Sequence, residues 1–201
     1  MKKYTGVMAM KDYQAAMLLA YPRAEKLIEN LGQLAEAKAY GSYSGREATE
    51  VCVARILSYL HARDCFAVLR DKVDEVLSQL TREERYLLEY KYFRRRKVLE
   101  GEFADMQCAF SARTYYRRQR RLEGKLNSLF LRGGADRAWF RALFSDIAYM
   151  RSLVEGVRRG DAMTDKRAHA TLRVRGGNGA PAKRAPARAK EEDRSSVRCI
   201  G

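Results

Sequence analysis

The sequence predicts an all-α fold, and three observations support this prediction. Only three prolines occur in the 201 residues, and two of them, Pro181 and Pro186, lie near the C-terminus, so few residues would interrupt a helix before residue 160. Apolar residues recur at three- and four-residue intervals over several long stretches, which is the period of one helix face. The segment Thr81-Arg-Glu-Glu84 is a capping box, which marks a helix N-terminus.

Two long helices are predicted over residues 12–39 and 46–80. Asp12 is a suitable N-cap for the first, Pro22 is expected to kink it, and the turn-rich segment Tyr40–Gly45 separates the two helices. Consecutive helices of this kind are expected to pack as an antiparallel hairpin, which gives a first domain over residues 1–72. In the second helix, the stripe that we assign to the core contains Val53, Ile56, Leu57, Leu60, Phe66, Leu69, Val73, Val76 and Leu80.

The region 73–132 is predicted to be a second domain that ends in a strongly basic helix. The capping box begins a helix that ends near Phe93, and Arg94–Lys97 follows as a basic connection. A short helix over 102–108 and a tight turn then precede a longer helix, for which Ser111 is a good N-cap. This order of elements is that of a helix-turn-helix, whose last helix lies in the major groove of DNA.

Beyond this region, the chain is predicted to end in one more helix and a tail. Gly133 and Gly134 are expected to terminate the basic helix. Residues 135–159 form a further amphipathic pattern, and Trp139 lies on its apolar face. From 160 to 201 the composition is dominated by Gly, Ala, Pro, Arg and Lys and the apolar period disappears, so this segment is predicted to be a disordered basic tail.

The charge balance indicates a polyanionic partner. The chain has a net charge of +15 and a pI near 9.9; nucleic acid is the first candidate and an anionic membrane surface the second. The sequence shows no signal peptide and no apolar run of the ~20 residues that a membrane span needs. We therefore expect a cytoplasmic protein without membrane association.

The cysteines favour a reducing compartment and no metal site. They form no CxxC pair and fit no zinc spacing. Cys52, Cys65 and Cys108 lie among apolar helical residues, where small buried side chains are expected.

The helix that follows Ser111 carries the candidate binding residues. Its predicted inner face contains Tyr115, Leu122, Leu126 and Leu129. Arginine suits guanine because its guanidinium matches O6 and N7, and the first residues of such a helix reach base edges while later ones meet phosphates. The predicted DNA-binding surface is composed of Ala112, Arg113, Thr114, Tyr116, Arg117, Arg120, Arg121 and Lys125.

Two segments, LTREERYLLEYKYF at 80–93 and FSARTYYR at 110–117, resemble region four of bacterial sigma factors, a winged-helix-like helix-turn-helix that reads the upstream promoter element. The arrangement is also similar to that of the ArpU-type phage transcriptional regulators, which implies a phage or other mobile element. The resemblance implies that Ser111 caps the recognition helix, that Tyr115 is its buried anchor, and that Ala112, Arg113, Tyr116 and Arg117 face DNA.

The match to the family pattern is incomplete in the first helix of the motif. Ala104-Asp105 stands where an apolar–small pair is usual, and Ala109 stands where the turn usually has glycine. The chain also lacks a segment like the sigma region that melts promoter DNA. The resemblance therefore implies a sigma-like regulator rather than a complete sigma factor.

The sequence as a whole predicts a sequence-specific, DNA-binding transcriptional regulator that reads duplex DNA in the major groove with helix 111–126. The alternative is a protein–protein adaptor that binds RNA polymerase or another partner, with non-specific nucleic-acid binding by the tail. The helix of Trp139 could form a homodimer surface. Catalysis and cofactors are not expected, because only His61 and His169 occur and no nucleophile, phosphate-loop or metal motif is present.

Overall fold

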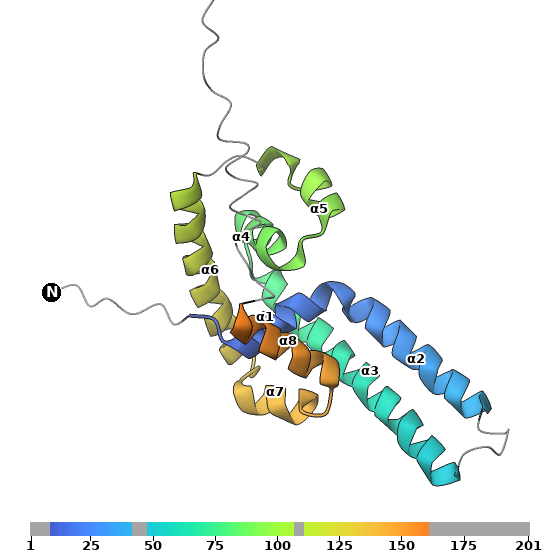
Figure 1. Ribbon diagram of the computed structural model, residues 1–201. Helices are drawn as coiled ribbons and strands as arrows, with labels where there is room; N and C mark the ends of the chain where they lie inside the picture. The colour runs from blue at the N-terminus through green and yellow to red at the C-terminus, as the bar shows by residue number, and fades with distance from the viewer. Residues whose placement is uncertain (1–8, 42–47, 107–110, 161–201) are drawn as a thin grey trace, which may run out of the picture.

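The computed structural model describes residues 9–41, 48–106 and 111–160, and every element in these ranges is helical (Figure 1). The all-α prediction is therefore confirmed. The α-helices are α1 (Asp12–Ala20), α2 (Ala24–Gly41), α3 (Thr49–Ser78), α4 (Arg82–Leu88), α5 (Arg96–Gly101), α6 (Ala112–Arg132), α7 (Arg137–Phe144) and α8 (Ala148–Arg159). Short turns of other helical types join some of them: η1 (Tyr21–Arg23), η3 (Glu89–Phe93) and η4 (Ala104–Met106).

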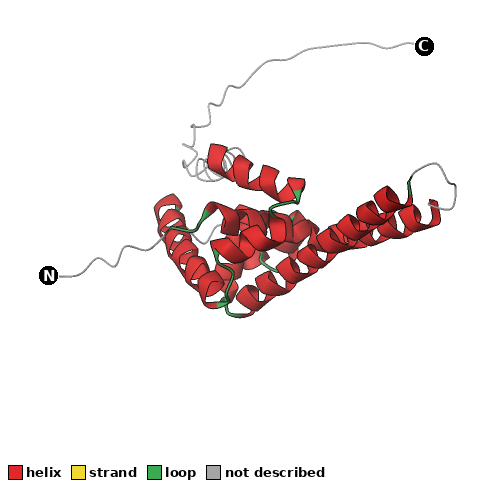
Figure 2. Cartoon of the chain, turned by 90° about the horizontal axis from the view of Figure 1, so that it is seen from below, coloured by secondary structure: helices red, strands yellow, loops and turns green. Residues whose placement is uncertain are grey.

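The predicted antiparallel hairpin is formed by α2 and α3, which lie side by side and extend away from the other helices (Figures 1 and 2). The predicted kink is also confirmed: α1 ends at Ala20, and the 3-10 turn η1, which contains Pro22, leads into α2. Tyr21 in this turn donates a hydrogen bond to the carboxylate of Asp74 on α3, and its ring lies 5.0 Å from the ring of Phe93. Burial and the hydrogen bond to Asp74 raise the pKa of Tyr21 to about 12.

A single hydrophobic core joins α1 to helices far along the chain. The cluster includes Met17 of α1, Leu69 of α3, Leu88 of α4, Leu126 of α6 and Met150 of α8. The predicted domain boundary at residue 72 falls within α3, whose residues on both sides of that point contribute to this core. The body of the protein is therefore built around α1, which α8 covers along one side.

The start of α1 differs from the prediction. The N-cap position is Lys11 and not Asp12, which lies in the first turn. Gln14 is completely buried, and its side-chain oxygen accepts a hydrogen bond from the Lys11 N–H at 2.9 Å. Tyr13, next to it, donates to the carbonyl of Ala135 at 3.4 Å. These bonds replace the predicted aspartate cap and tie α1 to the connection between α6 and α7.

The single helix predicted over 135–159 is wrong, because the structure has two helices there. Asp136 caps α7 by accepting from the Trp139 N–H at 2.8 Å. The chain then leaves the helix at Ser145 and Asp146, residue types that compete with the backbone for hydrogen bonds, and α8 begins at Ala148. The break allows Phe144 and Met150, at 1% and 0% exposure, to reach the same core.

Two further predictions concern burial and membranes. Cys52 and Cys65 are free and buried, as expected, whereas Cys108 and Cys199 lie outside the described residues. The tight turn predicted before Ser111 also lies outside the described residues. Of the tail predicted over residues 160–201, only Gly160 is described.

Among the helices that the structure describes, none is long and apolar enough to cross a bilayer.

Candidate nucleic-acid interface

The basic helix begins where the sequence predicts. Ser111 is the N-cap of α6, and its hydroxyl oxygen accepts from the Thr114 N–H at 3.3 Å. At the other end, Gly133 is the C-cap and Gly134 has a φ of 76°, a left-handed conformation that glycine adopts without strain. The sequence therefore fixes both ends of a helix of 21 residues.

The inner face of α6 is the predicted one. Leu122, Leu126 and Leu129 are at most 4% exposed, and Tyr115 is 3% exposed with its ring 5.6 Å from the ring of Tyr90. This packing fixes the rotation of α6 about its axis. The opposite face is consequently held toward solvent.

Four arginines occupy that outward face: Arg113, Arg117, Arg120 and Arg121. We refer to them as the arginine stripe. At 100° per residue they lie within about 100° of one another, and they span about 12 Å along the helix axis. All four are exposed, and none has a side-chain ion pair with another residue in the described ranges. Unpaired guanidinium groups on a rigid helix can bind an anionic partner without first breaking an internal contact.

The other predicted site residues differ in their surroundings. Ala112 is exposed in the first turn of α6, whereas Thr114 and Tyr116 are half-buried. The Ser111 hydroxyl donates to the Thr114 hydroxyl oxygen at 3.0 Å, and the Tyr116 ring packs 5.4 Å from that of Tyr115.

Lys125 lies closer to the body of the protein, and its Nζ is 2.6 Å from Oε2 of Glu84. The structure thus places the predicted residues on one helix, but only part of the set on its open face.

Three ion pairs attach α6 to α4 and η3. Glu84 of α4 pairs with Lys125, and Glu83 of α4 pairs with Arg118. Lys91 of η3 binds Glu123 at 2.8 Å, and this pair is largely buried, since only 11% of the Lys91 side chain and 21% of the Glu123 side chain are exposed. Glu84 also completes the predicted capping box, since it accepts from the Thr81 N–H at 2.9 Å. The sequence did not reveal these pairs, because their partners are 32 or more residues apart.

The contacts of Glu84 give a pH-dependent attachment. Burial raises its pKa, but the hydrogen bonds from Lys125 and Thr81 outweigh burial and hold the pKa below the ordinary 4.5. When the pKa of a carboxylate is lower in the folded than in the unfolded protein, ionisation of that carboxylate stabilises the fold. This stabilisation is complete at pH values above the unfolded-state pKa. It is lost as the pH falls through the folded-state pKa. The ion pair with Lys125 is therefore present at neutral pH and lost in acid.

We expect Glu84→Gln to lower the free energy of unfolding by about 1 kcal/mol at neutral pH. The difference from the wild-type protein should shrink as the pH falls below about 4.5, because both chains then carry an uncharged side chain. Urea unfolding at a series of pH values measures this difference. A difference that is the same at neutral and acidic pH would contradict the assigned role of Glu84.

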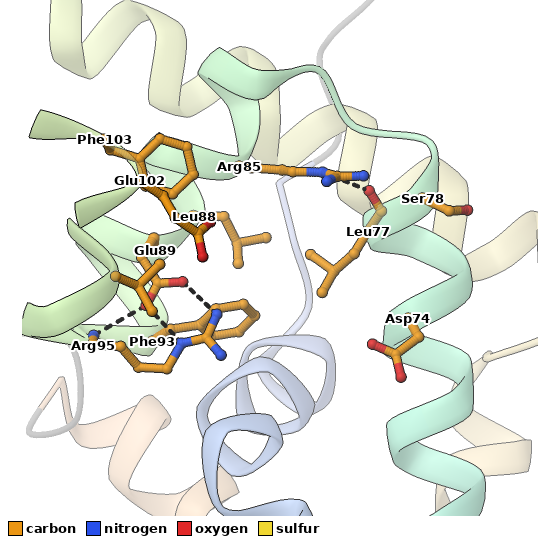
Figure 3. Close-up of a pocket in the computed structure, with 11 residues that line it drawn as sticks. Asp74, Leu77, Ser78, Arg85, Leu88, Glu89, Phe93, Arg95, Glu102 and Phe103 are labelled. Carbon is orange, nitrogen blue, oxygen red and sulfur yellow. Dashed lines mark hydrogen bonds and ion pairs between the residues drawn. The ribbon is translucent and has the colours of Figure 1, made fainter. Parts of the chain in front are cut away.

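The basic connection predicted at Arg94–Lys97 is only partly a loop. Arg96 and Lys97 form the first turn of α5, and the short helix predicted over 102–108 is replaced, in its described part, by the single 3-10 turn η4. A buried carboxylate that was not among the predicted site residues lies just before this segment. Glu89 is 3% exposed and accepts from the backbone N–H of Arg95 and, at 2.9 and 2.7 Å, from its guanidinium (Figure 3). This pair fixes the chain just before α5.

The rest of the basic segment stays near the surface. Arg94, Arg96 and Lys97 are exposed, and Arg96 pairs with Glu100 at 2.6 Å. The Arg95 side chain is also 44% exposed, but its guanidinium is held by Glu89, and this hydrogen bond raises the pKa of the guanidinium. All four cations of this segment therefore reach the surface, and Arg95 differs from the others in being held by a buried carboxylate.

A cavity of about 340 Å³ opens between the end of α3 and the start of α5 (Figure 3). Its charged lining is largely engaged within the protein: Glu89 with Arg95, Asp74 with Tyr21, and Arg85 through a hydrogen bond from Nε to the Leu77 carbonyl. The lining also mixes both signs of charge. The cavity thus lacks the single-signed, unpaired character of the arginine stripe.

Comparison with known proteins gives no relative from which a function could be transferred. No protein-family model matches the chain, no curated protein matches it, and no solved structure matches it.

Proposed function

We propose that the protein is a non-catalytic, sequence-specific DNA-binding regulator that inserts α6 into the major groove. The observation that carries this proposal is the arginine stripe, four exposed arginines that have no ion pair within the described part of the chain and lie on one face of a capped and firmly packed helix. A major groove about 12 Å wide admits an α-helix. The 12 Å length of the stripe corresponds to about three to four base pairs at 3.4 Å per step.

Within this proposal the two ends of the stripe have different tasks. Arg113 and Arg117 lie in the first turns of α6, where side chains reach base edges, and each can donate two hydrogen bonds to guanine. Arg120 and Arg121 lie further along and meet phosphates. The sigma-like helix-turn-helix resemblance favours the same orientation, because it implies that Ala112 and Tyr116 also face DNA. From its place in the first turn, Thr114 would lie beside the bases, and Lys125, further along α6, would lie near the backbone.

The proposal includes a regulatory role with duplex DNA as the main partner. RNA polymerase is a further candidate partner, as it is for sigma region four. The high net charge supports rapid, salt-dependent association with DNA. The exposed cations Arg94, Arg96 and Lys97 would add phosphate contacts if the duplex extends from α6 toward α5.

A salt series with two arginine variants tests the proposed division of tasks. We expect Arg121→Ala to weaken binding to all duplexes alike and to reduce the slope of log K against log salt by about one. Arg113→Ala should instead discriminate between duplexes, with a loss of about 1–3 kcal/mol on the preferred sequence and little on others. Fluorescence anisotropy with labelled duplexes measures both effects.

The matched control is Lys26→Ala, which removes one exposed positive charge from α2 in the hairpin. It should leave the salt slope unchanged, because α2 lies away from α6 (Figure 1). If Arg121→Ala and Lys26→Ala behave alike, or if both arginine variants keep wild-type affinity, α6 is not the binding surface.

A further inference from the structure

The hairpin has an exposed distal part whose role the DNA-binding proposal does not explain. We define the hairpin arm as α2 (Ala24–Gly41) together with the first half of α3, residues 49–64. The arm extends beyond the other helices (Figures 1 and 2). Within it, α2 packs against α3 and also contacts η1, the turn that precedes α2. Three residues of the arm are buried: Ala24 at its start, at 0% exposure, and Ala35 and Cys52 further out, at 4% and 3% exposure. Two helices alone can bury only one face each.

Apolar side chains remain exposed on the arm as a consequence. Val53 is 48% exposed and Leu57 is 59% exposed, and Leu60 is half-buried beside them. We call these three residues the Leu57 stripe. Their spacing of four and then three residues is that of the seam through which helices pack in bundles. Further exposed apolar side chains on the arm are Leu34, Tyr40 and Val51.

The charge of the arm indicates which partner could cover this stripe. In the arm, the acidic residues are Glu25, Glu29, Glu36, Glu50 and Asp64, and the basic residues are Lys26, Lys38, Arg55 and Arg63. The arm is therefore close to neutral in a chain of net charge +15. A polyanion has no preference for such a surface. Two copies of this chain repel each other through their basic parts, but they can approach through their arms without that penalty.

We propose that two copies of the chain associate through the Leu57 stripe and pack their arms into a symmetric four-helix bundle. In a two-fold contact the same surface patch serves both copies, so each stripe covers the other. Short antiparallel hairpins can form such bundles in pairs. The inference depends on the contacts and charge of the arm and does not require that α6 binds DNA.

The experiment is sedimentation equilibrium of the full chain, freed of nucleic acid, over a wide concentration range. We expect the wild-type mass to approach twice the 23.1 kDa of one chain. Val53→Glu combined with Leu57→Glu should raise the dimer dissociation constant by at least about 100-fold, because it places charges in an apolar contact. Leu57→Gln, which adds no charge, should weaken the dimer in the same direction.

Ser58→Glu is the matched control, because Ser58 is exposed on α3 next to Leu57 but on a different face of the helix. It should leave the dimer intact, and circular dichroism should show the same helix content in all variants. The proposal is overturned if the wild-type chain stays at 23.1 kDa throughout, if the variants of the stripe remain dimeric, or if Ser58→Glu dissociates the dimer equally.

Discussion

Arg95→Ala is expected to lower the free energy of unfolding by about 3 kcal/mol, because it leaves the carboxylate of Glu89 buried without its cationic partner. Glu89 is 3% exposed, and the guanidinium of Arg95 supplies two of its three hydrogen bonds, at 2.9 and 2.7 Å. The Arg95 guanidinium also lies 5.2 Å from the Phe93 ring. A domain is stabilised by only about 5–15 kcal/mol in total, so this loss would be visible in any unfolding experiment.

Two further variants separate this explanation from a general effect of losing an arginine. Arg96→Ala, at the next position, removes an exposed ion pair with Glu100 and should lower stability by less than about 0.5 kcal/mol. Adding Glu89→Gln to Arg95→Ala removes the buried charge and should recover part of the loss. Equal losses for Arg95→Ala and Arg96→Ala in urea unfolding would show that the pair between Arg95 and the buried Glu89 does not stabilise the fold.

Replacing all four arginines of the stripe by alanine is expected to lower the affinity for duplex DNA by about 1,000-fold near physiological salt. Base contacts by arginine contribute about 1–3 kcal/mol each, and each phosphate contact adds to the salt-dependent part of binding. Alanine is the best helix former, so α6 should keep its helical structure. The inner face of α6 is untouched by these changes, and thermal stability should stay close to that of the wild type.

The control for this variant removes the same charge elsewhere. Arg23, Lys26, Arg141 and Arg151 are exposed and lie outside α6. Their joint replacement by alanine changes the net charge by the same four units, so it tests whether affinity depends on total charge or on position. A loss of affinity as large as that of the stripe variant would mean that charge alone drives binding.

The elements that the sequence predicted well are those with local signals. The cap at Ser111, the inward positions of Tyr115 and Leu122 and the capping box at Thr81 each depend on residues within a few positions of one another. The orientation of α6, and therefore the location of the arginine stripe, follows from these residues. The general position of the candidate site could thus be predicted from sequence.

The errors have two physical causes. The first is contact between distant residues: Glu84 with Lys125 and Lys91 with Glu123 depend on how α4, η3 and α6 meet. Periodicity carries no information about such pairs. The second cause is competing local chemistry, as at Ser145 and Asp146, two polar residues at which α7 ends although the apolar period continues past them.

The hairpin shows a further limit of periodicity. Val53 and Leu57 were assigned to the core because they follow a helical stripe, yet both are exposed in the structure. A period identifies which residues share a face but not whether another element covers that face. The exposure of these two apolar side chains is the observation from which the proposed dimer surface follows.

The central claim is that α6 reads DNA sequence, and selection from a pool of duplexes with a randomised segment tests it most directly. We predict that the wild-type protein enriches one short motif, and that the variant lacking the arginine stripe enriches none while the charge-matched control enriches the same motif as the wild type. Enrichment of the wild-type motif by the stripe variant would contradict the claim, and so would a wild-type selection that yields no motif.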